Sequence, residues 1–512
     1  MRPWFSLLLL GIPSLPLLAG LIARFDPAPR AGRRATVAAA FAALLAVVVA
    51  IAAFAEGQLA LPWASFGPAA PVALKLRVDA IAGVMVVLVS FLGLVVLRFS
   101  RHYLDGDPGQ NRFFSWMSLT LASVLTLVLA SNLLLLLLAW IATSLCLHRL
   151  LLHYPERAGA VFSARKKFVV SRLGDLCLFV AAVLLFRAYG TWDLEGLFAA
   201  VRARPDPSLP VVGGFLVACA ALKSAQFPFH GWLPDTMETP TPVSALMHAG
   251  IINAGGYLIV RLGPVLAQAP GALHALAVVG AVTAAFGATV MLAQPSVKRA
   301  LAFSTIAQMG FMMVQCGLGA YGLALLHIVA HSLYKAHAFL SAGSTVGAAP
   351  RAAIPLGTPA LSLGVLVGGL IVTSVATVLQ VLQPVAAKPD GFTVVLALAL
   401  AYGLARSWSA GAGWRTVARS TGFAFAVGAA GVAFQSAGRV LVPDLPSAPP
   451  PPAVLGFVGL VFSSLFLFQA LLWRAGHHAP GRRWYVHALN GFYVGTLGNR
   501  LLGWLWPRPL PD

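Results

Sequence analysis

The sequence is poor in charged residues, and above all in acidic ones. Only 10% of its 512 residues are Asp, Glu, Lys or Arg, and just 15 residues are acidic. Soluble domains carry about 25% charged residues. The 59% share of hydrophobic residues and the mean hydropathy of +0.85 therefore exclude a soluble domain with a single anchor. They predict a polytopic membrane protein, with the lipid bilayer as its main surroundings.

Cysteine is scarce as well. The four cysteines stand singly inside apolar runs and form no CxxC pair: Cys146, Cys177, Cys219 and Cys316. This spacing excludes an iron–sulfur cluster or a zinc site of the paired-cysteine type, and we expect buried, inert thiols. A nucleotide-binding fingerprint is also missing from the sequence. We expect no metal and no cofactor in this chain, and any catalysis to belong to a partner chain.

The shortage of acidic residues leaves a formal net charge of +20. Such a charge can indicate a nucleic-acid partner, but no basic stretch here alternates with aromatic residues. Membrane proteins gather Lys and Arg in their cytoplasmic loops, which explains the charge without nucleic acid. We therefore expect no nucleic-acid partner.

Long apolar runs are what the chain has in abundance. The first, from Trp4 to about Ile22, lacks a small-residue cleavage site and is long enough to span, which favours a retained helix. The sequence thus predicts an all-α polytopic membrane protein with about 15 transmembrane helices. A tight turn is expected at 130–132, and longer links at 57–78, 189–210 and 440–452. The runs fall near residues 4–23, 35–55, 79–97, 113–130, 132–153, 168–188, 211–226, 244–266, 272–293, 299–317, 320–346, 361–382, 391–406, 417–437 and 453–473.

The basic residues indicate an orientation. They cluster in odd-numbered links, which lie on one side of the membrane, and the positive-inside rule places that side in the cytoplasm. The N-terminus is then outside and the C-terminus cytoplasmic. The basic tail ends in an amphipathic segment, Trp484 to Trp506, which we expect on the membrane surface or on a partner. The basic clusters are Arg24, Arg30, Arg33 and Arg34; Arg98, Arg101 and Arg112; Arg157, Arg165, Lys166 and Lys167; Lys298 and Arg299; and Arg415 and Arg419.

A lysine stands where one apolar run breaks. Lys223 ends the run, a proline-rich link with Asp235 and Glu238 follows, and the next run carries His248. Hydrocarbon cannot solvate these groups, and a broken helix is tolerated at membrane depth only inside protein or beside a watery cavity. Snorkelling of Lys223 to the headgroups is the alternative. We favour an ion or proton path, because freed carbonyls at a break can hold a cation and histidine titrates near neutral pH.

A second group of ionisable residues recurs every four positions. His327, His331 and Lys335 stand in LHIVAHSLYKAHAFL, which puts all three on one helical face. Such a stripe cannot comfortably face lipid. Two histidines at this spacing can bind metal, but no carboxylate or cysteine is near to complete a site. We therefore interpret the stripe as a proton relay.

Other polar residues support these two groups. Asn253 lies on a turn next to His248, and Arg172 and Asp175 lie one turn apart, which predicts an ion pair. Lys298 opens its helix and could be an ordinary residue at a cytoplasmic helix end. Asp79 begins the third helix and could be an N-cap.

These motifs resemble the antiporter-like membrane subunits shared by respiratory complex I and Mrp-type cation/proton antiporters, most of all the large L-type branch. The resemblance covers residues 75–350 and rests on long segments such as SRHYLDGDPGQNRFFSWM, ARKKFVVSRLGDLCLF and LKSAQFPFHGWLPDTMETPTPVSALMHAGIINAGG. It implies two inverted five-helix repeats, each with one broken helix. It also implies roles. Lys223 would be the broken-helix lysine and His248 the bridging histidine, Arg172 and Asp175 a pair near the first half-channel, and Lys298, His327, His331 and Lys335 the central relay.

Two departures from the family refine the resemblance. Ile141 stands where the family has a glutamate, and the run at 361–382 has no ionisable residue. With AWIATSLCLHRLLLHY and the ending WYVHALNGFYVGTLGNRLLGWLWP, the chain is most similar to the membrane subunits of DAB-type inorganic-carbon accumulation complexes. This resemblance implies a large cytoplasmic zinc-containing partner resembling DabA and similar to β-carbonic anhydrases. It also implies a place in the bacterial inner membrane, where cation influx drives conversion of CO2 to bicarbonate.

Two alternatives stay open from the sequence. The chain could be an L-type proton-pumping subunit of an NADH-quinone oxidoreductase-like complex, or a subunit of an Mrp-type cation/proton antiporter. The driving ion could be a proton or sodium, since helix-break carbonyls suit either. We divide the chain into N-terminal transmembrane helices with a basic loop (1–78), an antiporter-like conducting core (79–350), C-terminal transmembrane helices (351–473) and a cytoplasmic basic amphipathic tail (474–512).

Overall fold

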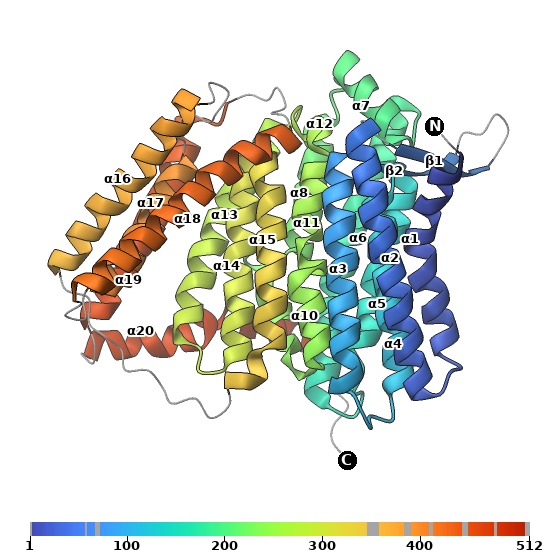
Figure 1. Ribbon diagram of the computed structural model, residues 1–512, viewed down its shortest axis with the longest axis horizontal. Coiled ribbons are helices and arrows are strands. Elements are labelled where there is room, and N and C mark those ends of the chain that lie inside the picture. Colours follow the sequence, from blue (N-terminus) through green and yellow to red (C-terminus); the bar gives the residue numbers. More distant parts are fainter. Residues whose placement is uncertain are drawn as a thin grey trace.

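The computed structural model describes residues 3–56, 59–66, 72–345, 358–382, 391–408, 413–442, 449–475 and 479–506. These residues form a bundle of helices with one small hairpin, and most of the helices lie side by side (Figure 1). The first half contains α1 Pro3–Ala23, α2 Ala28–Glu56, β1 Leu59–Phe66, β2 Val72–Val78, α3 Ala80–Tyr103, α4 Gln110–Leu129, α5 Leu133–Leu151, α6 Ala158–Tyr189, α7 Leu194–Ala203, α8 Leu209–Lys223, η1 Phe229–Gly231, α9 Trp232–Asp235, η2 Thr236–Glu238, α10 Thr241–Ala249, η3 Ile251–Asn253, α11 Ala254–Arg261 and α12 Gly263–Leu266. The second half contains α13 Pro270–Ala293, α14 Val297–Gly317, α15 Tyr321–Leu340, η4 Ala342–Thr345, α16 Thr358–Leu382, α17 Gly391–Trp408, α18 Trp414–Leu441, α19 Pro452–Ala475, α20 Ala479–Leu489, η5 Gly491–Tyr493 and α21 Val494–Leu505.

The helices confirm the predicted class. Within the described residues, 11 helices are long and apolar enough to cross a membrane, and four shorter apolar helices accompany them. Together they match the expected number of about 15. The tight turn is also present: α4 ends at Leu129, α5 begins at Leu133, and the side chain of Asn132 accepts hydrogen bonds from Leu134 N and Leu135 N.

Two of the expected links contain structure that the sequence did not predict. In the link at 57–78, strands β1 and β2 pair antiparallel, with Leu59 opposite Val78. In the link at 189–210, α7 begins after Asp193, whose side chain accepts from Gly196 N. Residues 443–448 of the link at 440–452 lie outside the described residues. These elements are short, and only apolar runs of spanning length are conspicuous in the sequence of a membrane protein.

The packing falls into one large core and two small ones. The large core runs through the helices from α1 to α15. A second cluster joins α16, α17 and α18, which stand at the left in Figure 1. A third attaches α19 to α13 and α14 through Val458, Ala281 and Val314. Helix α16 runs unbroken from Thr358 to Leu382, so it is not the second broken helix that the resemblance implies. The chain between α8 and α10 is broken into short helical turns.

Helices α13 and α14 pack unusually closely, because small residues face each other. A Cβ added to Gly287 would lie 2.6 Å from Ala307 N, and one added to Gly280 would lie 2.6 Å from Gly310 O. Small residues allow this approach, which is how helices associate within a membrane.

We therefore expect Gly287→Ala to destabilise the protein. The added methyl group meets backbone atoms that cannot move aside, and overpacking of this kind costs about 1–3 kcal/mol. The measurement is the unfolding temperature of the purified protein in detergent. Gly271→Ala is the matched control: it lies in the same helix, is exposed, and has no atom within 4 Å of the added Cβ. Equal unfolding temperatures for the two variants would contradict the close packing.

Helix α6 corrects part of the sequence analysis. The helix begins at Ala158, ten residues before the expected start at 168, so Arg165, Lys166 and Lys167 lie in a helix and not in a link. Lys166 and Lys167 are also buried. Buried lysines are tolerated where they find polar partners, and both do. A hydropathy pattern cannot show such partners, because they come from other helices.

Candidate ion path

The break after Lys223 is built as the sequence predicted. Helix α8 ends at Lys223, and three single helical turns fill the stretch before α10 begins at Thr241. Ser224 and Gln226 are fully buried. Ser224 Oγ donates to Ile252 O at 2.7 Å, and Phe227 N donates to Thr283 Oγ1 at 3.0 Å. The break is therefore sheltered inside protein, where backbone polar groups can be satisfied.

Lys223 is buried beside Trp140. Its side chain is 6% exposed, so the ammonium does not reach the surface, and this argues against snorkelling. Nζ lies 4.6 Å from the centroid of the Trp140 ring, a cation–π distance. Within the described part of the chain, Nζ makes no hydrogen bond. Ile141 packs against the apolar core, so residue 141 gives Lys223 no counter-charge.

Asp175, on α6, is a carboxylate whose charge acts on Lys223. It interacts electrostatically with Lys223, Arg172 and Lys167 and is itself buried. The predicted ion pair is present: Arg172 Nη2 lies 2.6 Å from Asp175 Oδ2. The single carboxylate of Asp175 is therefore the negative charge near several cationic side chains at the start of the break.

His248 and Asn253 flank a distortion in the next span. Helix α10 ends at Ala249, a 3-10 turn follows, and α11 continues from Ala254. His248 Nδ1 lies 3.1 Å from Thr305 Oγ1, and its ring stacks on Phe339 at 4.4 Å. Asn253 Nδ2 donates to Ala249 O and, at 2.9 Å, to Ser332 Oγ on α15. A 3-10 stretch within a helix often marks a functional hinge.

The three residues of α15 do share one face. His327 Nδ1 lies 2.9 Å from Gln315 Oε1, and the rings of His327 and His331 are 6.0 Å apart. Lys335 is fully buried, and its Nζ donates to Leu301 O at 3.1 Å. Lys298 is half-buried in the first turn of α14, one turn before Leu301.

The structure brings most of the expected residues into two groups. One contains Lys223, Arg172 and Asp175. The other forms where α10 packs on α15, since His248 interacts electrostatically with Lys335 and His331. The hydrogen bond from Ser224 to Ile252 joins the end of the first group to the segment of Asn253. Lys298 stands at the edge of the second group.

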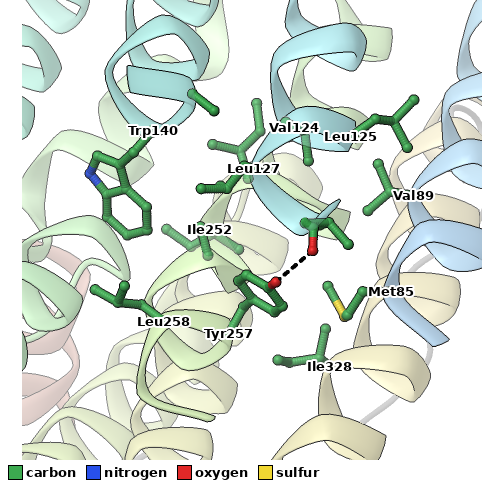
Figure 2. Close-up of a cluster of buried hydrophobic side chains, with 14 of the residues drawn as sticks. Met85, Val89, Val124, Leu125, Leu127, Trp140, Ile252, Tyr257, Leu258 and Ile328 are labelled. Atoms are coloured by element: carbon green, nitrogen blue, oxygen red, sulfur yellow. Dashed lines mark hydrogen bonds between the residues drawn. The ribbon is translucent and has the colours of Figure 1, made fainter. Parts of the chain in front are cut away.

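An apolar cluster lies next to Trp140, the residue whose ring faces Lys223 (Figure 2). Tyr257 OH donates to Val128 O at 2.8 Å, and apolar side chains surround this bond. Such a cluster offers a charge no polar partners. Its members include Met85, Val89, Val124, Leu125, Leu127, Ile252, Leu258 and Ile328.

Sequence reasoning missed several residues of the site. Lys167 Nζ donates to Ser144 O at 2.7 Å and to Ser144 Oγ at 3.0 Å. Lys166 Nζ lies 2.8 Å from Asp235 Oδ2 and 2.6 Å from Asn499 Oδ1. The sequence does hold a signal for Lys167: it stands four residues before Ser171 and eight before Asp175, so the three share one helical face.

The C-terminal tail lies against the bundle at the end opposite the start of α1 (Figure 1). Gln294 Nε2 donates to Leu489 O, and the Phe286 and Phe492 rings are 6.1 Å apart. Arg165 stacks on Trp506 at 4.7 Å. With the bond to Asn499, these contacts attach α20 and α21 to α6, α13 and the helix break. His477 and His478, which belong to the expected basic tail, lie outside the described residues.

The four cysteines differ in burial. Cys219 and Cys316 are buried as expected, whereas Cys146 and Cys177 are half-buried. Among the residues that the structure describes, no three His, Cys, Asp or Glu side chains gather as a metal site would require.

Two family models match the chain. The model described as NADH:quinone oxidoreductase/Mrp antiporter, TM, matches residues 130–354, and the model of the complex I chain 5 N-terminus matches residues 63–114. The first match contains every residue of both groups. The solved structure of the Mrp complex from Dietzia sp. superposes with a TM-score of 0.64 at 24% identity, over 99% of this chain and 60% of that chain. The likeness shows that the fold is shared.

Several curated proteins are similar in sequence. The probable inorganic carbon transporter subunit DabB2 of Halothiobacillus neapolitanus is 38% identical over 98% of this chain and 94% of its own. The corresponding DabB subunit of Hydrogenovibrio crunogenus is 46% identical over 51% of each chain. The NADH-quinone oxidoreductase subunit L of Mycobacterium tuberculosis is 41% identical over 53% of this chain and 44% of its own.

Proposed function

Because this chain belongs to the family of antiporter-like, proton-conducting membrane subunits that includes the DabB inorganic-carbon transporter subunits, we propose that it conducts protons inward for an inorganic-carbon accumulation complex. The carrying observation is the match to DabB2, which extends over 94% of that relative. The L subunit is matched over only 44% of its length. We further propose that the complex lies in the bacterial inner membrane.

The arrangement of the buried lysines and histidines supports proton conduction. Lys223, His248, His331 and Lys335 are all buried, and ionisable groups at such positions in a membrane protein are costly, rare and typical of ion and proton pathways. We propose that protons pass between the Lys223 group and the α15 face through the segment of His248 and Asn253. Lys298 would then mark one end of the path. Histidine and lysine exchange protons and do not coordinate sodium, which favours protons as the driving ion.

Two features argue against the redox and antiporter alternatives. Ile141 removes a carboxylate from the first half of the path, and α16 has no ionisable residue. A subunit that pumps or exchanges ions through two complete half-channels would need such groups in both. A subunit that lets protons run inward to drive a partner needs only one continuous route.

The partner is proposed to be a large cytoplasmic zinc-containing subunit resembling DabA, similar to β-carbonic anhydrases. Proton entry through this chain would drive its conversion of CO2 to bicarbonate. The test is affinity purification of the tagged chain from its native membrane. We expect one large chain with stoichiometric zinc to co-purify. A set of redox subunits, or several small membrane subunits, would instead support one of the alternatives.

We expect the tail to form part of the seat for this partner. Deleting residues 475–512 should release the large subunit from membranes while this chain stays inserted, because α20 and α21 lie on the side assigned to the cytoplasm. The measurement is the ratio of the two chains in washed membranes. Deletion of residues 507–512 alone, which spares α20 and α21, is the control. If the partner stays bound at full stoichiometry after the deletion, the tail only lies on the membrane surface, and the partner binds the cytoplasmic loops instead.

A further inference from the structure

Lys167 is a buried lysine beside the Lys223 group, outside the route proposed between Lys223 and the α15 face. Its side chain is 2% exposed, and it lies in α6, inside the part of the bundle that faces α5. Both of its hydrogen bonds go to Ser144. Burying a lysine inside a membrane protein costs free energy, and a smaller polar residue could join the two helices at a lower cost.

Two polar stripes face each other around Lys167. On α6, Lys167, Ser171 and Asp175 recur every four residues, and all three are buried. Four-residue spacing puts them on one face of the helix. On α5, Trp140, Ser144 and His148 recur with the same spacing. The stripes thus form two matching ladders.

The two helices meet along the ladders at three levels. At one end, the side chains of Trp140 and Asp175 both lie near Lys223. In the middle, Lys167 donates to Ser144. At the other end, the His148 ring packs on Phe168 at 5.1 Å between centroids. Helices α5 and α6 therefore run antiparallel with the polar groups between them.

The ladders lead from the helix break to one end of the bundle. At the inner end, Lys223 lies over Trp140 and interacts electrostatically with Asp175 and Lys167. At the outer end, His148 is half-buried in the last turn of α5. This is the end at which Arg165 meets the tail residue Trp506.

We propose that Lys167, with Ser144 and His148, forms the section of the proton path between Lys223 and the tail end of the bundle. The inference deepens the proposed function and rests on it. In the inward direction Lys223 gives its proton to the Asp175 carboxylate, which protonates the neutral amine of Lys167. Lys167 passes the proton through the Ser144 hydroxyl to the imidazole of His148, which releases it to water. Lys223 then takes up a new proton from the side of His248 and Asn253, so one proton moves at each step, no electron moves, and every group returns to its starting state.

This section also explains how the path works with Ile141 in place of a glutamate. Asp175 supplies the carboxylate from α6, and Lys167 supplies a second exchangeable cation on the same face. The section ends beside the attachment of the tail, so the released protons arrive at the side where the partner is proposed to bind.

The test compares two substitutions of Lys167. The complex, purified with its co-purifying chain, is reconstituted into liposomes, and proton flux is followed with an internal pH-sensitive dye under an imposed potential. Lys167→Met removes the proton carrier. Lys167→Arg keeps the charge and the hydrogen-bond donors but does not release a proton at accessible pH. We expect both to lower the flux by roughly tenfold or more, as when one member of a unit is lost.

Controls separate this inference from the proposed function. Lys75→Met makes the same chemical change at the hairpin, where Lys75 pairs with Asp193, and should conduct normally. Wild-type flux in Lys167→Arg would show a fixed structural cation and overturn the inference, as would wild-type flux in Lys167→Met. If Lys223→Met blocks flux while both Lys167 variants conduct, only this section fails. If Lys223→Met conducts as well, the proposed function fails with it.

A second variant covers the case in which the Lys167 variants do not fold. His148→Phe keeps an aromatic ring against Phe168 at a half-buried position near the helix end. It should leave the yield unchanged and lower the flux to a similar extent. Flux at the wild-type level in this variant would overturn the section as proposed.

Discussion

Replacing Lys223 with alanine is expected to abolish growth at low CO2 while the protein remains inserted in the membrane. Lys223 is the buried cation at the helix break, and its ammonium group faces Trp140 and the field of Asp175. Alanine removes the proton carrier that joins the segment of His248 and Asn253 to Asp175 in the proposed path. We expect proton flux through the reconstituted complex to fall by roughly a hundredfold, the scale of a lost proton-transfer group.

Growth and flux have to be read against the amount of inserted protein. Lys75→Ala, which removes a lysine from the ion pair with Asp193 at the hairpin, should grow and conduct like the wild type at equal expression. Unimpaired growth of Lys223→Ala at low CO2 would reject the assignment of Lys223. An insertion assay shows whether Lys223→Ala still reaches the membrane. If it does not, growth and flux are measured again with Lys223→Met, which preserves side-chain volume.

The second large effect is expected on the face of α15. Each single alanine change at His327, His331 or Lys335 should remove most of the flux, and a double change should add little. Groups that act as a unit are non-additive in this way, because losing one member already disables the others. The measurement is the proton flux of three single and three double variants. His337→Ala, on an exposed position of the same helix, is the matched control.

Additive, small losses would give these residues a structural role instead. His327 is bonded to Gln315 and Lys335 to Leu301 O, so removing either also deletes a hydrogen bond. A purely structural loss would lower the unfolding temperature in proportion to the lost flux. A relay predicts lost flux with a much smaller change in stability, and the two measurements together separate the cases.

The helices and the break were predictable from the sequence for a simple reason. Hydrocarbon imposes runs of about 20 apolar residues on any helix that spans it. The same solvent makes Lys223, His331 and Lys335 conspicuous, because ionisable groups are rare at that depth. The i, i+4 spacing then fixed the shared face on α15, and the structure confirms that face.

The pattern of apolar and charged residues could not show contacts between segments that lie far apart in the chain. Lys166 and Lys167 read as basic loop residues because they are charged and adjacent. Only packing shows that one reaches Asp235 and Asn499 and the other reaches Ser144. The hairpin was missed for a related reason, since β1 and β2 are too short for a span and their pairing is decided by each other.

By itself, therefore, the sequence determined the membrane class, the number of spans, the position of the break and the residues with exceptional charge. Each of these follows from the local match between side chains and a hydrocarbon solvent. The tertiary structure decided which charges meet. Lys223 faces the ring of Trp140 and has the α6 carboxylate of Asp175 as its charge neighbour, since residue 141 supplies no charge. His248 lies by the α15 face, and the tail is attached near the helix break. Electrostatic partners are chosen by distance in space, and separation along the chain does not encode that distance.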